Sequence, residues 1–197
     1  MREEALRMSS LVNNLLDMAR LESGVVELNR QWQPLEEVVG SALRAVRSTI
    51  AGHHIKVDLP EHFLLLEFDV ATIERVLSNL LENGAQYTPI GSTISIGAAP
   101  GDRGHLQIGV EDNGPGIAVG KENDIFKNFE RGKKDSAALG VCLGLAICRA
   151  IVDAHGGSIR VEGRAGGGAR FVFSIPRGLP PVVDLTADDA VEQRITP

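Results

Sequence analysis

The sequence offers little that is typical of membrane, disulfide-bonded or zinc-binding proteins. No apolar run approaches the roughly 20 residues that a membrane helix needs, and no signal peptide opens the chain. The two cysteines, Cys142 and Cys148, lie close together in or beside one predicted helix, and no cysteine–histidine spacing fits zinc. We therefore expect reduced thiols in a cytoplasmic chain, with Cys148 as a small core residue.

An excess of positive charge is also missing. The formal net charge of −6 argues against a nucleic-acid-binding protein. What is present is ordinary for a globular protein: 197 residues, 43% hydrophobic and 23% charged, without an internal repeat. This length is enough for one domain with a real core plus appendages.

An amphipathic helix is predicted over residues 2–22, which contain neither proline nor glycine. Met8, Leu11, Leu15 and Met18 recur at a 3-4-3 spacing, the pattern of a helical bundle or coiled-coil seam. Ser23 and Gly24 end this helix. Because a lone helix cannot bury such a stripe in itself, the stripe must pack on the domain or on another chain.

Residues 25–177 carry apolar patterns of both helix and strand period, without strict alternation of the two. Helices are predicted over residues 35–46, 70–87 and 143–155, and strands over 25–33, 55–59, 64–68, 94–98, 106–110, 159–161 and 171–175. This succession predicts an α+β fold, a two-layer sandwich of one mixed sheet with helices on one face. Residues 178–197, proline-rich and then acidic, are predicted to form a disordered tail after this domain.

The helix predicted over residues 70–87, with Asp69 as its N-cap, carries a polar stripe opposite its leucines. Asn79, Asn83 and Gln86 lie at positions i, i+4 and i+7, and therefore share this stripe. Amide oxygens suit a hard cation such as Mg²⁺, which completes its shell with water and phosphate. The alternative for such a stripe is an ordinary solvated helix face.

The segment DNGPGI, residues 112–117, follows a predicted strand. Asp112 closes that strand, where its carboxylate is placed to accept a hydrogen bond from an exocyclic amine. Gly114 and Gly116 allow a tight turn and a close approach to a planar ligand. By itself the segment also fits an ordinary Asp-Asn-Gly turn.

A second glycine-rich segment, GVCLGL at residues 140–145, directly precedes and opens the last predicted helix. Glycines before a helix N-terminus present unpaired N–H groups and the positive end of the helix dipole, an arrangement that binds phosphate. A glycine-rich loop without a ligand is the alternative. Residues 118–138 are charged and poorly periodic, and so are predicted to form a long loop that acts as a lid.

In this order and spacing, the three segments resemble the N, G1 and G2 boxes of the ATP-binding domain of sensor histidine kinases, a fold shared with gyrase and Hsp90-type ATPases. The F box of that family corresponds to IFKNFERG at residues 125–132. Longer stretches, LVNNLLDMARLESG, WQPLEEVVGSAL and GLAICRAIVDAHGG, resemble the cytoplasmic part of the sensor kinases of Kdp potassium-uptake systems. The resemblance covers about residues 2–177.

The resemblance implies ATP and Mg²⁺ as cofactors and assigns roles to individual residues. Asp112 would accept from the adenine amino group, Asn83 would ligate Mg²⁺ with Asn79 supporting it, and Tyr87 would pack against adenine. Phe126 and Phe129 would anchor the lid, and the lid cations Arg131, Lys133 and Lys134 would reach phosphates. The remaining implied nucleotide-site residues are Gly114, Gly116, Ile117, Gly140, Cys142, Leu143, Gly144 and Leu145.

The implied reaction is phosphoryl transfer from ATP to a histidine on the first helix of a dimeric hairpin, followed by a response regulator as partner. None of the five histidines here has the family's acceptor context. Residues 2–22 resemble the second helix of that hairpin. The expectation is therefore a C-terminal part of a kinase, with a homodimer through this helix and membrane-anchored full-length relatives.

Three positions depart from the family pattern. Gln86 stands where a lysine or arginine is usual, Cys142 where glycine is usual, and Gly84 where alanine is usual. If the backbone at Cys142 were left-handed, its side chain would cost about 1–2 kcal/mol. Two alternatives stay open: a degenerate nucleotide- or partner-binding module, and an ATP hydrolase or serine kinase, although those use a glutamate where Asn79 stands.

Overall fold

The computed structural model describes residues 28–60, 65–118, 120, 122, 124–126, 136–164 and 166–178, and the side chains of the last helix from Gly144 onward. The predicted helix over residues 2–22, the tail beyond Gly178, and the lid residues Phe129, Arg131, Lys133 and Lys134 lie outside this range. None of the helices in the described part is long and apolar enough to span a membrane.

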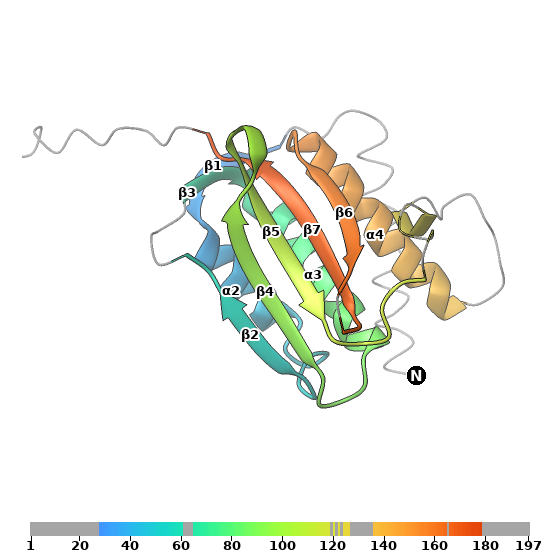
Figure 1. The fold of residues 1–197 in the computed structure, drawn as a ribbon. Helices are drawn as coiled ribbons and strands as arrows, with labels where there is room; N and C mark the ends of the chain where they lie inside the picture. The colour runs from blue at the N-terminus through green and yellow to red at the C-terminus, as the bar shows by residue number, and fades with distance from the viewer. Residues whose placement is uncertain are drawn as a thin grey trace, which may run out of the picture.

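A five-stranded mixed sheet forms one layer of the fold, and three helices cover one of its faces (Figure 1). The strand order is β2-β4-β5-β7-β6, with β2 parallel to β4 and the remaining pairs antiparallel. The strands are β2 His54–Asp58, β4 Thr93–Pro100, β5 His105–Asp112, β6 Ser158–Gly163 and β7 Ala169–Pro176. The predicted α+β sandwich is therefore confirmed.

The helical layer consists of α2 Leu35–Ala45, α3 Val70–Tyr87 and α4 Ser136–Ala154, with α3 packed between the other two. A separate antiparallel ribbon pairs β1 Arg30–Pro34 with β3 Leu65–Asp69. The chain passes from β3 directly into α3. Two short 3₁₀ turns, η1 Asp102–Gly104 and η2 Asp124–Phe126, complete the elements of the described residues.

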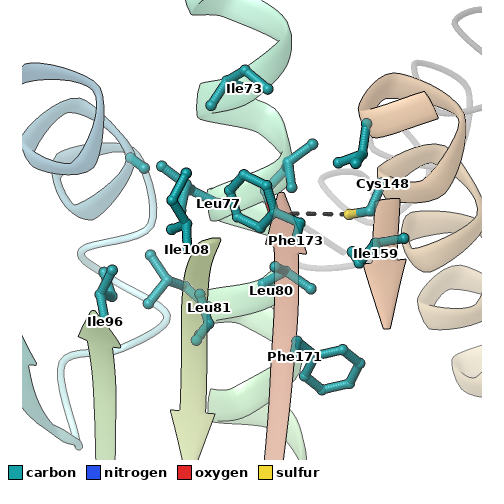
Figure 2. Packing of buried hydrophobic residues seen from close by; sticks show 14 of the residues in the cluster. Ile73, Leu77, Leu80, Leu81, Ile96, Ile108, Cys148, Ile159, Phe171 and Phe173 are labelled. Carbon is teal, nitrogen blue, oxygen red and sulfur yellow. Dashed lines mark hydrogen bonds between the residues drawn. The ribbon is translucent and has the colours of Figure 1, made fainter. Parts of the chain in front are cut away.

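The sequence pattern explains why α3 lies where it does. Its leucine face is fully buried against the sheet: Figure 2 shows Leu77, Leu80 and Leu81 opposite side chains of the strands. Asp69 caps its first turn by accepting a hydrogen bond from the Thr72 amide at 3.0 Å, as predicted. Both helix bounds match the prediction.

The sheet strands follow the predicted alternation. Ile94 and Ile96 on β4 and Ile108 on β5 are fully buried, whereas the residues between them point to the open face. Strands β6 and β7, both predicted, pair as an antiparallel hairpin, with Arg164 and residues 166–168 in the connection between them. One face of the sheet therefore supplies the core, and the ends of β5 and the β6–β7 turn meet at one edge.

The start of the last helix differs from the prediction. Helix α4 begins at Ser136, seven residues before Leu143, so Gly140, Cys142 and Gly144 all lie inside it. The expected phosphate-binding loop directly before Leu143 is wrong for this structure. Residues 136–141, SAALGV, contain good helix formers that continue the apolar pattern of the helix, and these outweigh the cost of about 1 kcal/mol for one glycine.

Cys148 is a core residue, as predicted. Its side chain is fully buried between α4 and α3, within hydrogen-bonding distance of the Val76 carbonyl (Figure 2). Burial raises the pKa of the Cys148 thiol to about 12. The thiol is therefore protonated at physiological pH and is not a nucleophile.

Candidate functional site

Two of the three polar residues predicted on α3 face its neighbours rather than water. Asn79 points at α4, where its Nδ2 group donates to the Gly144 carbonyl at 3.4 Å and approaches Cys148 Sγ at 3.7 Å. Asn83 is 8% exposed, and its Oδ1 atom is buried with no hydrogen-bond partner among the residues that the structure describes. Gln86, in contrast, is exposed.

A buried amide oxygen without a partner costs free energy, typically about 1–3 kcal/mol. At Asn83 the oxygen is therefore either a defect or an acceptor site that a ligand fills. No group of three or more acidic, histidine or cysteine residues capable of holding a metal occurs within the described part of the chain. A divalent ion here would rely on a single amide ligand, with water and phosphate oxygens completing its shell, which fits Mg²⁺.

Asp112 ends β5 and is 7% exposed. Its Oδ1 atom accepts two backbone hydrogen bonds, from the Gly114 amide at 2.8 Å and from the Ala169 amide at 3.3 Å. A carboxylate held by backbone donors on one oxygen has a fixed orientation. Asp112 is thus a buried, oriented acceptor at the C-terminal end of the central strand β5, and the sequence predicts it at a strand end.

Both predicted glycines after Asp112 lie at points of close approach. A Cβ atom on Gly114 would fall 2.7 Å from the Thr88 methyl and 3.0 Å from Asp112 Oδ1. Gly116 has a φ of +77°, and a Cβ there would fall 2.9 Å from the Gly168 carbonyl. Glycine is required at both positions, because any side chain would displace the backbone around Asp112.

Thr88, which the sequence reasoning did not single out, joins α3 to this loop. It is 8% exposed, its hydroxyl donates to the Gly84 carbonyl at 2.8 Å, and its methyl group packs over Gly114. The available signal is its place at the C-cap of α3, directly before Pro89. Thr88 therefore fixes the distance between the helix of Asn83 and the loop of Asp112.

The turn between β6 and β7 encloses the other side of Asp112. Gly166, Gly167 and Gly168 have φ values of +94°, +98° and +98°, and Gly168 lies so close to the Asp112 carbonyl that no side chain fits. Arg164 Nη1 donates to the same carbonyl at 2.8 Å. The sequence predicted the strands on either side of this segment but not its contact with Asp112.

The remaining predicted residues at the end of α3 and after β5 form the rim of this region. Tyr87 is 50% exposed, so it does not belong to the core. Ile117 is partly buried and packs against the core. Tyr87 lies next to the Asp112–Gly116 loop, because a Cβ atom on Gly114 would fall 3.1 Å from the Tyr87 carbonyl oxygen.

Phe126 of η2, one of the two residues predicted to anchor the lid, is buried. It is 4% exposed and meets Phe171 of β7 edge-to-face, with ring centroids 6.4 Å apart at an interplanar angle of 83°. The Arg149 guanidinium of α4 lies 4.7 Å from the centroid of the Phe126 ring. This contact ties the start of the predicted lid to α4.

The glycine-rich segment of residues 140–145 is helical and contacts α3 rather than forming a loop. Gly144 is buried, and a Cβ on it would lie 3.7 Å from the Asn79 amide carbon. Leu145 is 5% exposed and belongs to the core. The expected left-handed strain at Cys142 is wrong, since Cys142 is helical and Arg103 is the one non-glycine residue with positive φ among the described residues.

The sequence model of one family, described as histidine kinase-, DNA gyrase B-, and HSP90-like ATPase, matches residues 68–179. The sensor protein KdpD of Escherichia coli (strain K12) is 47% identical over 189 residues, which cover 95% of this chain and 21% of that protein. The KdpD of Clostridium acetobutylicum is 37% identical over 171 residues, 86% of this chain and 19% of that protein. The chain thus spans about a fifth of the length of these relatives.

Two solved structures share the fold. Full-length ShkA in complex with AMPPNP superposes with a TM-score of 0.76 at 28% identity, covering 89% of this chain and 37% of that one. The catalytic domain of the histidine kinase ThkA gives a TM-score of 0.65 at 28% identity, covering 77% of this chain and 98% of that one. On the match over residues 68–179, the chain belongs to the family of histidine kinase-, DNA gyrase B-, and HSP90-like ATPases.

Proposed function

We propose that this chain is the ATP-binding catalytic domain of a two-component sensor histidine kinase, which transfers the γ-phosphoryl group of ATP to a histidine on a helical hairpin. The observation that carries the proposal is the buried Asp112 carboxylate, oriented by two backbone N–H groups at the end of β5. The similarity to KdpD and to the ThkA catalytic domain supports it.

Asp112 would hold the adenine base. An oriented carboxylate oxygen accepts a hydrogen bond from the 6-amino group of adenine but repels the 6-keto oxygen of guanine. Because Gly114 and Gly116 have no side chains, the base could approach the backbone of this loop closely. The half-exposed Tyr87 would cover one face of the base, and Ile117 would border the site on the other side of the loop. The base would thereby be fixed against the edge of the sheet.

Asn83 would hold Mg²⁺ through its unpartnered Oδ1 atom, and the ion would neutralise charge on the phosphates. Asn79 would act indirectly, because it joins α3 to α4 through the Gly144 carbonyl. The lid cations Arg131 and Lys133 would reach the phosphates from the lid. Gly140, Cys142, Leu143, Gly144 and Leu145 would border the phosphates only after the first turns of α4 rearrange.

The partners proposed for the domain are a phosphoacceptor hairpin, a response regulator and a second copy of the chain. Among the histidines of this chain, His155 is 2% exposed and cannot accept a phosphoryl group in the folded state. None of the five stands in the family's acceptor context.

The proposed site of action is the cytoplasm, and the similarity to KdpD supports a role in potassium sensing.

Titration with MgATP tests the binding step. We expect the chain to bind MgATP in a calorimeter and the Asp112→Asn variant to bind it at least tenfold more weakly, since a hydrogen bond to a charged group contributes about 1.5–3 kcal/mol. GTP serves as the control ligand and should bind poorly to the parent chain. Equal affinity of the parent and Asp112→Asn for MgATP would contradict the placement of the base.

A labelling experiment tests the transfer step. The chain alone, incubated with γ-labelled ATP, should gain no acid-labile phosphate. Addition of a matching phosphoacceptor hairpin should give labelling of the hairpin histidine, which Asn83→Ala abolishes. If the chain binds MgATP but never labels the hairpin, the domain is a nucleotide-binding module rather than a kinase.

A further inference from the structure

Arg164, which lies in the turn after β6, makes two contacts with consecutive residues at the end of β5. Its Nη1 group donates a hydrogen bond to the Asp112 carbonyl at 2.8 Å, and its Nε atom lies 3.2 Å from Glu111 Oε2. The side chain is 37% exposed, so the guanidinium lies at the boundary between the site and solvent. One planar cation thus binds both Glu111 and the first peptide group of the DNGPGI segment, between Asp112 and Asn113.

That peptide determines where the Asp112 carboxylate points. The Asp112–Asn113 peptide leads to the Gly114 amide, which donates to Asp112 Oδ1 at 2.8 Å. The Asn113 side chain accepts from the Thr93 amide at 2.9 Å and fixes the outer end of the same segment. The Arg164 side chain donates to the carbonyl of this peptide. It therefore fixes the orientation of the Asp112–Asn113 peptide plane, from which the loop begins.

The partner of Arg164 is itself held in place. Glu111 Oε1 lies 2.9 Å from Arg170 Nε, and Arg170 Nη1 lies 3.8 Å from Glu162 Oε2. Glu162 Oε1 in turn pairs with Arg160 Nε at 2.7 Å. These five alternating charges form a line across β5, β7 and β6 that ends at Arg164, while Arg160 at its other end binds Glu162 and Gln107.

We infer that Arg164 is a positioning residue for the base-binding carboxylate and so contributes to the selection of a 6-aminopurine over a 6-oxopurine. The inference rests on the proposed role of Asp112. Arg164 acts through the Asp112 carbonyl and makes no contact with the nucleotide itself. Lysine replaces it only in part, because an ammonium group cannot bind the carbonyl and the Glu111 carboxylate with the fixed fork of a guanidinium.

The test compares Arg164→Ala and Arg164→Lys with Arg160→Ala, a matched change at the far end of the same line of charges. We expect Arg164→Ala to weaken MgATP binding about threefold to tenfold, with Arg164→Lys between it and the parent. The ratio of MgATP to MgGTP affinity should fall in parallel. Arg160→Ala should leave both quantities within about twofold of the parent, since exposed ion pairs contribute little.

A double-mutant cycle shows whether Arg164 acts through Asp112. In the Asp112→Asn background, Arg164→Ala should cause no further loss of MgATP affinity beyond about twofold, because interacting residues are non-additive. The amide resonances of Gly114 and Ala169 should shift in Arg164→Ala but not in Arg160→Ala. Additive losses, or unchanged resonances of these two amides, would overturn the inference.

The same measurements separate this inference from the proposed function. If Asp112→Asn loses MgATP binding while Arg164→Ala retains full affinity and selectivity, Arg164 is not a positioning residue and the proposed function stands. If the parent chain binds no MgATP, the proposed function itself fails. If Arg164→Ala and Arg160→Ala weaken binding equally, the effect belongs to the general charge of this face, and the inference is wrong.

Discussion

Two asparagines on one helix have opposite environments. Asn79 uses its amide group to join α3 to the Gly144 carbonyl of α4, whereas Asn83, one turn later, buries an oxygen that has no partner among the described residues. The first arrangement stabilises the fold, and the second costs stability. A residue kept at such a cost is expected to have a function, which here is proposed to be Mg²⁺ binding.

Substitution of the two asparagines should therefore give opposite results. Asn83→Ala should leave the free energy of unfolding unchanged or slightly higher, but should remove most of the Mg²⁺ dependence of ATP binding. Asn79→Ala should lower the free energy of unfolding by about 0.5–1.5 kcal/mol while Mg²⁺ still strengthens ATP binding. Denaturant titrations and calorimetry with and without Mg²⁺ measure both quantities. A normal Mg²⁺ effect in Asn83→Ala would exclude the asparagine as a ligand.

Gly84 is a second residue whose cost is visible in the structure. It lies inside α3 and is buried, and a Cβ on it would fall 3.3 Å from the terminal Cδ1 of Ile94. An alanine in a helix interior is more stable than glycine by roughly 0.5–1 kcal/mol, and a terminal methyl group can move by a few tenths of an ångström.

We therefore expect Gly84→Ala to raise the free energy of unfolding by about 0.5 kcal/mol without changing MgATP affinity. Thermal or urea unfolding of the two proteins measures the change. Gly84→Val is the control, because its branched side chain should clash with Ile94 and lower the stability. If Gly84→Ala destabilises the domain, Ile94 is held more rigidly than its terminal position suggests.

At the level of elements, one junction joins β1, α3 and α4 at the ends of the two helices opposite to Asn83. The Asp69 carboxylate caps α3 and also accepts from the Asn29 amide at 2.9 Å, while the Asp69 amide donates to His155 Nε2 at 3.1 Å. Arg30 of β1 donates to the Ala154 carbonyl at the C-terminus of α4. The position of α4 relative to α3 therefore depends on His155.

His155 makes the stability of this junction sensitive to pH. Its Nδ1 lies 2.8 Å from the Ile151 carbonyl and its Nε2 accepts from Asp69, which defines a neutral ring. Burial, and to a lesser degree the charge of Arg30, lowers its pKa below the ordinary 6.5, against opposing effects of the Ile151 carbonyl and Asp69. Below about pH 6.5, His155 is therefore protonated in the unfolded chain while it still stays neutral in the folded chain.

The contribution of His155 is therefore complete above about pH 6.5 and decreases as the pH falls below that value. We expect the free energy of unfolding to fall between pH 7.5 and 5.5, and the fall to be smaller in His155→Gln, which keeps a donor and an acceptor without titrating. His54→Gln, a change at an exposed histidine, is the control. An identical pH profile for the parent and His155→Gln would contradict this assignment.

The helices also show where sequence patterns succeed. The bounds of α3 could be predicted because Asp69 and the leucine face are local signals for its start and its orientation. The start of α4 could not, because glycines favour both a loop and a buried helix face, and the choice depends on contacts such as Gly144 with Asn79. Strand alternation was enough to predict the sheet face but not the pairing order.

For the whole molecule, the candidate site combines predictable and unpredictable parts. Asp112, Gly114, Gly116 and Asn83 were identified from motifs, since each has its chemistry in its own side chain or backbone. Arg164, which binds the Asp112 carbonyl, carries no such signal. Its role arises from the register of β5, β7 and β6, which brings residues about fifty positions apart in the sequence into contact, as their hydrogen bond shows.

The described part of the molecule also bears on the predicted helix over residues 2–22, which lies outside it. The exposed large apolar side chains of the described residues are Val57 on β2, Leu65 on β3, Tyr87 at the end of α3 and Ile90 in the turn that follows it. Four side chains are few for the apolar stripe of a five-turn helix to cover. The stripe of Met8, Leu11, Leu15 and Met18 is therefore expected to pack on another chain.

We accordingly expect the full chain to self-associate in sedimentation experiments, with an average mass that rises with concentration. A version that begins at Gly24 should remain monomeric at all concentrations, because it lacks the stripe but retains the whole described core. Leu11→Glu together with Leu15→Glu should have the same effect as the truncation. The free energy needed to bury two charges in the seam exceeds the stabilisation from the remaining apolar contacts. MgATP affinity should be equal in the three proteins, because every residue proposed for the site follows Gly24 in the sequence. Monomeric behaviour of the full chain would show that the helix packs on its own domain after all.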